Sequence, residues 1–266
     1  MTNNCLFLNI ADYYFKINFL ENDLKFIFDN LKKEIGSKFS GFISTNIPKK
    51  YQFEINIIVS NKFDVFFNRN KKDVYIKFYR YTSPYTVETY YQISIYQFQL
   101  ILIDGIYRIL IKNKAFIFHA SANLINGKAS LFLGGDGAGK STIMKILRNK
   151  FTPLADDSMI IRKIKDKYYA FQTPFIEKET WLKRKKGKYL LGKIYFINKA
   201  DFYSIKKISS IESALKKTIE LNKHFSITDK EYYQQVKSQM EFTSDFPYQY
   251  NLHFGLNKKK VLSLFI

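Results

Sequence analysis

The stretch that decides the fold reads Ala115-Phe-Ile-Phe-His-Ala-Ser-Ala-Asn-Leu-Ile125, Asn126-Gly127, Lys128-Ala-Ser-Leu-Phe-Leu133, Gly134-Gly-Asp-Gly-Ala-Gly139 and Lys140-Ser-Thr142. Asn-Gly separates two apolar runs here, and this dipeptide best tolerates the positive φ angles of a type I′ hairpin turn. The second run leads into a glycine cluster, and residues 140–147 have the apolar spacing of a helix. The sequence therefore predicts a β-hairpin that continues through a loop into a helix.

Residues 134–141 read GGDGAGKS and match the phosphate-binding pattern GxxxxGK[ST]. Glycines let the backbone approach phosphate oxygens, and successive N–H groups at a helix N-terminus form an anion-binding nest. We expect Lys140 to contact the β- and γ-phosphates and Ser141 to offer a hydroxyl ligand to Mg²⁺. The pattern predicts ATP with magnesium, bound by Gly134, Gly135, Asp136, Gly137, Ala138, Gly139, Lys140, Ser141 and Thr142.

Two adjacent carboxylates, Asp156 and Asp157, follow the predicted helix after enough chain for the backbone to return beside the loop. Adjacent residues of an extended segment face opposite sides, so we expect one carboxylate to address the nucleotide and the other to brace the loop. Carboxylates near a triphosphate hold Mg²⁺ or deprotonate an attacking hydroxyl. Both roles are open to both residues.

His119 lies in the first apolar run. A single histidine in a strand is more often structural than catalytic. Counting outwards from the predicted turn, however, places His119 opposite Gly134, at the mouth of the phosphate loop. The hairpin register therefore makes it a candidate for the site.

Away from this stretch, the patterns predict two regions. Residues 1–94 alternate apolar and polar residues, as in 51–57 and 74–78, which is typical of half-buried antiparallel strands, with a helix at 21–33. Residues 95–112 repeat apolar residues at helical spacing and predict a buried helix. We also expect strands at 159–161, 168–171, 193–198 and 248–254, the last of them closing the chain, and helices at 210–222 and 229–242. These elements indicate a β-rich N-terminal region, 1–94, and an α/β nucleotide-binding domain with a mixed sheet, 95–266.

The chain has 43 Lys and Arg against 23 Asp and Glu, for a net charge of +20 over 266 residues. Such a charge favours anionic partners, but A/T-rich codons for Lys, Asn, Ile, Phe and Tyr explain much of it. The sequence lacks a nucleic-acid reader motif, so nucleic acid is disfavoured as the partner. The densest basic run, 183–188, is interpreted as a solvated loop or, alternatively, as a cover over phosphates or a dock for an acidic peptide.

The chain contains one cysteine, Cys5, which excludes an intrachain disulfide and a multi-cysteine zinc site. No apolar stretch reaches the roughly 18 residues that a spanning helix needs. These features, with the absence of a basic signal-like opening, predict a cytoplasmic protein without a membrane span.

Three segments together, 119–121, 126–142 and 154–157, resemble the catalytic domain of HPr kinase/phosphorylase and of shorter HPr-kinase-like proteins, including kinases of lasso-peptide clusters. The resemblance implies a P-loop on the fold shared with phosphoenolpyruvate carboxykinase, and ATP-dependent phosphorylation of a serine or similar hydroxyl on a peptide or small protein. It implies that Lys140 binds phosphate, that Ser141 with Asp156 or Asp157 binds Mg²⁺, that one aspartate, with Asp157 favoured, is the general base, and that His119 assists.

The sequence also departs from this family. Thr142 stands where a glutamate is usual, and the later glutamate-bearing, glycine-rich signature is missing. Glu177 and Glu179 are candidate replacements for the second metal ligand, and phosphorolysis of phosphoserine is not expected. The alternative function is a nucleotide-binding or ATPase module that regulates a partner without phosphorylating it, and a homo-oligomer is compatible with either function.

Overall fold

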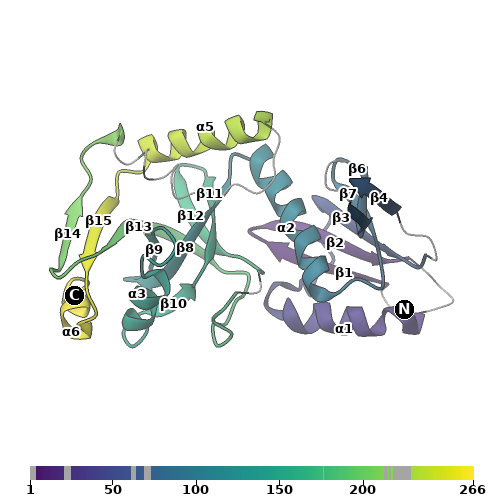
Figure 1. Cartoon of the computed structure of the whole chain (residues 1–266), viewed down its shortest axis with the longest axis horizontal. Coiled ribbons are helices and arrows are strands. Elements are labelled where there is room, and N and C mark those ends of the chain that lie inside the picture. The colour runs from purple at the N-terminus through teal and green to yellow at the C-terminus, as the bar shows by residue number, and fades with distance from the viewer. Residues whose placement is uncertain are drawn as a thin grey trace. The chain divides into compact units, whose positions relative to one another are not determined.

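A computed structural model describes residues 4–20, 25–60, 64–68, 73–175, 177–212, 215, 217 and 229–266 (Figure 1). The chain forms two compact units, Met1–Ile109 and Leu110–Ile266. Each unit combines helices with a mixed sheet of parallel and antiparallel strands. The predicted boundary after residue 94 falls at the start of helix α2 (Ile95–Lys112), whereas the division between the units falls near the end of this helix.

The first unit contains a five-stranded sheet in the order β1-β2-β3-β7-β6. Its strands are β1 (Cys5–Ile10), β2 (Tyr13–Phe19), β3 (Phe53–Ile58), β6 (Tyr79–Ser83) and β7 (Thr86–Tyr90). Strand β3 pairs in parallel with both β2 and β7, so the prediction of antiparallel pairing is wrong for 51–57. The alternation of apolar and polar residues identifies which face of a strand is buried. This pattern is the same for a parallel and an antiparallel neighbouring strand.

The predicted strand at 74–78 belongs to a separate antiparallel pair, β4 (Asp64–Asn68) with β5 (Asp73–Lys77). Val74 and Ile76 are exposed there, so the expectation of a half-buried strand is wrong at this position. The apolar alternation is real, but among the described residues the pair forms a sheet of its own.

The first unit also contains helices with buried apolar residues, such as Leu31, Ile35, Phe98 and Ile101. A 3₁₀ helix, η1 (Lys25–Phe28), leads into α1 (Asp29–Lys38), followed by a 3₁₀ turn, η2 (Ser40–Phe42). The helix predicted at 21–33 therefore extends further than expected, and its first four positions, 21–24, lie outside the described residues. The prediction of a helix at 95–112 is confirmed by α2, where Gly105 lies so close to β3 that a Cβ would be 2.8 Å from the Phe53 ring. Among the described helices, none has both the length and the apolar character needed to cross a membrane.

The second unit is built on strands of one mixed sheet, with β9 pairing to both β8 and β13. The strands are β8 (Phe116–Ile125), β9 (Lys128–Leu133), β10 (Thr152–Ala155), β11 (Ser158–Ile164), β12 (Lys167–Gln172), β13 (Lys188–Lys199), β14 (Ser204–Lys207) and β15 (Gln249–Phe254). The helices are α3 (Lys140–Leu147), α5 (Asp229–Asp245) and α6 (Lys258–Ser263). Most of the helix predicted at 210–222 lies outside the described residues.

Most predicted elements of this unit are confirmed, including the hairpin, whose turn has φ of 50° at Asn126 and 73° at Gly127. The expectation that 248–254 closes the chain is wrong, because α6 follows β15. The side chain of Asn257 accepts a hydrogen bond from the N–H of Lys260 at 3.1 Å and caps this short helix.

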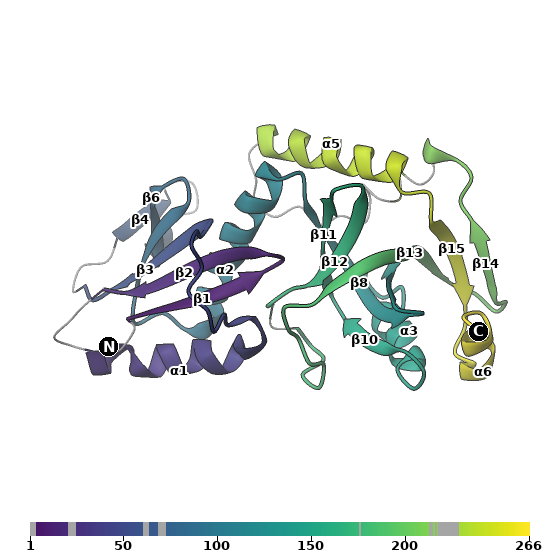
Figure 2. The same cartoon turned by 180° about the vertical axis from the view of Figure 1, so that it is seen from behind.

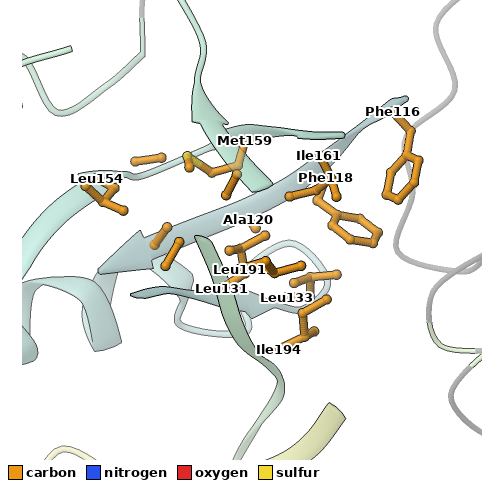
Figure 3. Close-up of a cluster of buried hydrophobic side chains, with 14 of the residues drawn as sticks. Phe116, Phe118, Ala120, Leu131, Leu133, Leu154, Met159, Ile161, Leu191 and Ile194 are labelled. Atoms are coloured by element: carbon orange, nitrogen blue, oxygen red, sulfur yellow. The ribbon is translucent and has the colours of Figure 1, made fainter. Parts of the chain in front are cut away.

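The sheet separates two apolar cores, as alternate residues of β9 demonstrate. Leu131 and Leu133 belong to a cluster that includes Phe242 of α5, and Figure 3 shows the strand residues of this cluster. Phe132 belongs instead to a cluster that includes Ile143 of α3 and Val261 of α6. Helix α5 therefore covers one face of the sheet, and α3 and α6 cover the other (Figures 1 and 2).

Helix α5 carries an unusual buried amide that generates a stability prediction. Gln239 is 0% exposed, and neither atom of its amide group has a hydrogen-bond partner in the part of the chain that the structure describes. An unpaired buried polar group costs about 1–3 kcal/mol. We expect Gln239→Met to raise the free energy of unfolding by about 1 kcal/mol and the melting temperature by a few degrees.

Thermal unfolding followed by circular dichroism measures this effect. The matched control is Gln234→Met on the exposed face of the same helix, which should leave the melting temperature near the wild-type value. A lower melting temperature for Gln239→Met would mean that the amide has partners in solution.

Candidate functional site

The loop that follows β9 has the backbone that its glycines predict. Gly137 and Gly139 have φ of 75° and 103°, a region that favours glycine. A Cβ on Gly134 would lie 2.7 Å from the side chains of both Ala138 and Ile197, so the loop closes tightly against β13. Helix α3 begins directly after it, at Lys140. The structure therefore places the matched sequence between a strand and a helix N-terminus.

Lys140 is folded over this loop. Its side-chain ammonium donates hydrogen bonds to the carbonyl oxygens of Gly134 at 2.8 Å and Gly135 at 3.1 Å, and the residue is only 8% exposed. The buried hydroxyl of Ser121 on β8 donates to the carbonyl of Lys140 at 2.6 Å. The central strand thus fixes the start of α3, and the ammonium group is held where anions would meet the loop.

The two aspartates lie on the opposite edge of β8 from the loop-bearing strand. Ala155 of β10 pairs with Ala122, and Ser158 of β11 pairs with His119, so the chain follows one edge of β8 on both sides of the aspartates. Between these pairs, the N–H of Ala120 donates to the carbonyl of Asp157 at 2.9 Å. We name residues 156–158 the aspartate turn.

Asp157 and His119 are in contact. The Nδ1 atom of His119 lies 3.0 Å from Oδ1 of Asp157, and its Nε2 atom lies 3.7 Å from Oδ1 of Asp136 in the phosphate loop. The side chain of His119 is largely buried, whereas that of Asp157 is 56% exposed. The imidazole therefore lies between the exposed carboxylate of the aspartate turn and the loop.

Asp156 points into the protein instead. It is 4% exposed, and its Oδ2 atom accepts a hydrogen bond from the N–H of Glu179 at 3.0 Å. Glu177 lies beside it, and burial, together with the neighbouring Asp156 carboxyl, raises the pKa of Glu177 to about 9. Glu177 consequently keeps its proton at neutral pH in the absence of a bound cation, because two adjacent carboxylates there need one compensating positive charge.

Glu177 also holds the aspartate turn. Its Oε1 atom accepts from the N–H of Ser158 at 3.1 Å and from the Ser158 hydroxyl at 2.8 Å, and its Oε2 atom accepts from the N–H of Asp156 at 3.4 Å. The hydroxyl of Thr173, after β12, donates to Oε1 at 3.4 Å. These hydroxyl residues were not predicted from the sequence, because single serines and threonines in strands carry no distinctive signal.

The carboxylate of Glu179 connects the same segment to the helix of the phosphate loop. It lies 2.6 Å from the ammonium group of Lys145 on α3, and it accepts from the indole N–H of Trp181 at 2.6 Å. These partners hold the pKa of Glu179 below its usual value. Segment 177–179 therefore bonds to α3 on one side and to the aspartate turn on the other.

The basic residues of the run 183–188 differ in how exposed their side chains are. Lys183, Lys185, Lys186 and Lys188 are exposed, as expected of a solvated loop. Arg184 is turned inward, and its charge opposes the rise in the pKa of Glu177. The structure thus separates one arginine near the acid pair from lysines that face solvent.

The donor set fits a magnesium ion that arrives with nucleotide. No group of three His, Cys, Asp or Glu side chains that could hold a metal occurs within the described ranges. Mg²⁺ typically takes one or two protein oxygens and completes its shell with phosphates and water. The Oδ1 atom of Asp156 is buried and has no hydrogen-bond partner among the described residues. This orphaned oxygen and the Ser141 hydroxyl are hard donors of the required kind.

Comparison with solved structures finds matching chains. No protein-family model matches the chain. No curated protein matches it. The chain is similar to the Hpr(Ser) kinase/phosphatase from Coxiella burnetii, with 11% identity and a TM-score of 0.28 over 56% of this chain and 93% of that one. A likeness of this size carries no information on the activity of the present chain.

The glycines of the loop provide a matched test of its geometry. We expect Gly134→Ala to lower the free energy of unfolding by about 1–3 kcal/mol, because the added methyl group collides with Ala138 and Ile197. Gly135→Ala is the control, since nothing lies within 4 Å of a Cβ at that position. Chemical denaturation measures both, and equal stabilities for the two variants would contradict the described packing of the loop.

Proposed function

We propose that the chain is an ATP- and magnesium-dependent kinase that transfers a phosphoryl group to a serine or similar hydroxyl of a peptide or small protein. The observation that carries the proposal is the contact of His119 with both Asp157, at 3.0 Å, and Asp136 of the phosphate loop, at 3.7 Å. Through this contact, an exposed carboxylate lies next to a loop suited to a triphosphate. The resemblance of the quoted motifs to HPr-kinase-like proteins supports the same reaction.

The loop supplies binding. N–H groups of residues 135–142 would surround the phosphates, and the positive end of α3 would add to their attraction. Lys140 would leave the carbonyl oxygens of Gly134 and Gly135 and bind phosphate oxygens, which offer a charge-assisted hydrogen bond in place of neutral ones. The same group that closes the loop in the described state thus becomes a ligand of ATP.

Asp157 is the proposed general base. The acceptor hydroxyl oxygen forms a bond to the γ-phosphorus, the bond from that phosphorus to the bridging oxygen of ADP breaks, and the hydroxyl proton passes to the Asp157 carboxylate. His119, whose Nδ1 atom lies 3.0 Å from Oδ1 of Asp157, orients this carboxylate. Asp156 has a different environment, and its burial favours a role in bracing the turn and in holding the metal.

Magnesium would be held by Ser141 and by Asp156 or Asp157, and it supplies charge neutralisation on the phosphates when it is bound. Glu177 and Glu179, the candidate replacements for a second ligand, use their oxygens on the aspartate turn and on Lys145 with Trp181, respectively. We therefore propose no metal role for either glutamate.

Two substitutions separate binding from chemistry. We expect Lys140→Ala to weaken MgATP binding by about 10- to 100-fold in isothermal titration calorimetry, because one charged hydrogen-bonding group is lost. Lys150→Ala, at an exposed position after α3, removes the same charge and should bind normally. Equal affinities of the two variants would place the nucleotide elsewhere.

Asp157→Asn should bind MgATP like the wild type and transfer phosphate about 10²–10⁴-fold more slowly, since it cannot accept the proton. The measurement is the gain of one phosphoryl group in the intact mass of serine-containing peptides encoded next to the gene. Binding of MgATP without transfer by the wild-type chain to any of these peptides would favour the regulatory ATPase instead.

A further inference from the structure

Between its two paired ends, the turn that presents Asp157 is bonded to β8 by the N–H of Ala120, which donates to the carbonyl of Asp157 at 2.9 Å. Regular strand pairing with β8 stops at Ala155 and resumes at Ser158. A carboxylate used as a base must be held in a defined orientation, and a misplacement of 1 Å can cost about 10²-fold in rate. The groups that fix this turn are therefore relevant to catalysis even where they do not reach substrate.

The N–H groups on the two sides of Asp157 both point to one side chain. Glu177 accepts from the N–H of Asp156 at 3.4 Å and from the N–H of Ser158 at 3.1 Å, and it accepts from the Ser158 hydroxyl at 2.8 Å. A single carboxyl group thereby brackets the residue between them. The connection is reciprocal, because the N–H of Glu179 donates to Asp156 at 3.0 Å.

The bracket is anchored independently at both ends. Ser158 pairs with His119 in the sheet, and its hydroxyl lies 2.9 Å from that of Thr173. Glu179 is tied to α3 through Lys145 at 2.6 Å. The position of Glu177 is consequently set by the sheet and by the helix of the phosphate loop together.

We propose that Glu177 is a positioning residue, which fixes the aspartate turn by accepting hydrogen bonds on both sides of Asp157 and so keeps that carboxylate against His119. The effect of Glu177 on the reaction rate rests on the proposed function. Its effect on the shape of the turn does not, because the hydrogen bonds of the turn exist without substrate. It makes no use of Glu177 as a metal ligand.

The proposal distinguishes Gln from Ala at this position. A glutamine has an oxygen that can accept both hydrogen bonds from Ser158 and an amide N–H that can donate to the Asp156 carboxylate, so it still holds both ends of the turn and loses only the 3.4 Å bond from the N–H of Asp156. Alanine removes it. We expect Glu177→Ala to lower kcat by about 10²-fold with little change in the KM for MgATP, whereas Glu177→Gln restores most of the wild-type rate. Glu34→Ala, at an exposed acid on α1, controls for the loss of a glutamate side chain elsewhere in the chain.

A second readout needs no activity. The chain has three histidines, and loss of a signal in His119→Gln assigns the imidazole resonances of His119 in an NMR spectrum. Asp157→Asn should move these resonances, and Glu177→Ala should move them in the same direction, while Glu177→Gln leaves them near the wild-type position. If Glu177→Ala does not fold, Ser158→Ala takes its place, since it removes one of the three hydrogen bonds to Glu177 from this turn.

Two results would overturn the positioning role. One is a His119 resonance that moves in Asp157→Asn but stays unchanged when the bracket is removed by Glu177→Ala or weakened by Ser158→Ala. The other is a Glu177→Gln variant as impaired as Glu177→Ala, which would exclude hydrogen bonding as the cause. A wild-type chain that neither binds MgATP nor transfers phosphate refutes the proposed function alone, because the NMR comparison still decides the role of Glu177.

Discussion

Strand β8 forms hydrogen bonds along both of its edges, and this double pairing determines where the candidate site residues lie. On one edge it pairs with β9, which leads into the phosphate loop. On the other edge it pairs with β10 and β11, on either side of the aspartate turn. A loop suited to phosphate and a pair of carboxylates are therefore brought to the two edges of β8 near Ala120, with His119 between them.

The charged groups of the site also have their partners within the protein. Lys140 is nearly buried and bonded to carbonyl oxygens, and Asp156 and Glu177 form a buried acid pair that retains a proton. Burying such groups is costly unless each has partners. Nucleotide and magnesium would exchange these internal partners for phosphate oxygens and a cation, without requiring a change in the sheet. The net charge of +20 favours the approach of such an anionic ligand.

The sequence was informative wherever a local pattern has one structural meaning. Asn126-Gly127 predicted the hairpin turn and its register, and that register placed His119 near the loop. The apolar spacing of 95–112 predicted α2 at its observed ends. The direction of pairing of β3 could not be predicted, because alternation is the same for parallel and antiparallel neighbours.

The surroundings of the aspartates were predictable only in part. Adjacent carboxylates on extended chain were expected to face opposite sides, and in the structure Asp157 is exposed while Asp156 is buried. The bracket formed by Glu177 had no local signal, since its partners Asp156 and Ser158 lie about twenty residues earlier in the chain and meet it only through the pairing of β11 with β12. The orientation of the Glu177 side chain therefore depends on the tertiary structure and not on the local sequence.

A crystal structure with magnesium and a non-hydrolysable ATP analogue tests the central claim most directly. The account predicts triphosphate density on the N–H groups of residues 135–142, Lys140 moved from the carbonyl oxygens of Gly134 and Gly135 to the phosphates, and Asp157 facing the γ-phosphate. Nucleotide bound away from this loop, or a γ-phosphate remote from Asp157 with Lys140 still on its carbonyl oxygens, would contradict it.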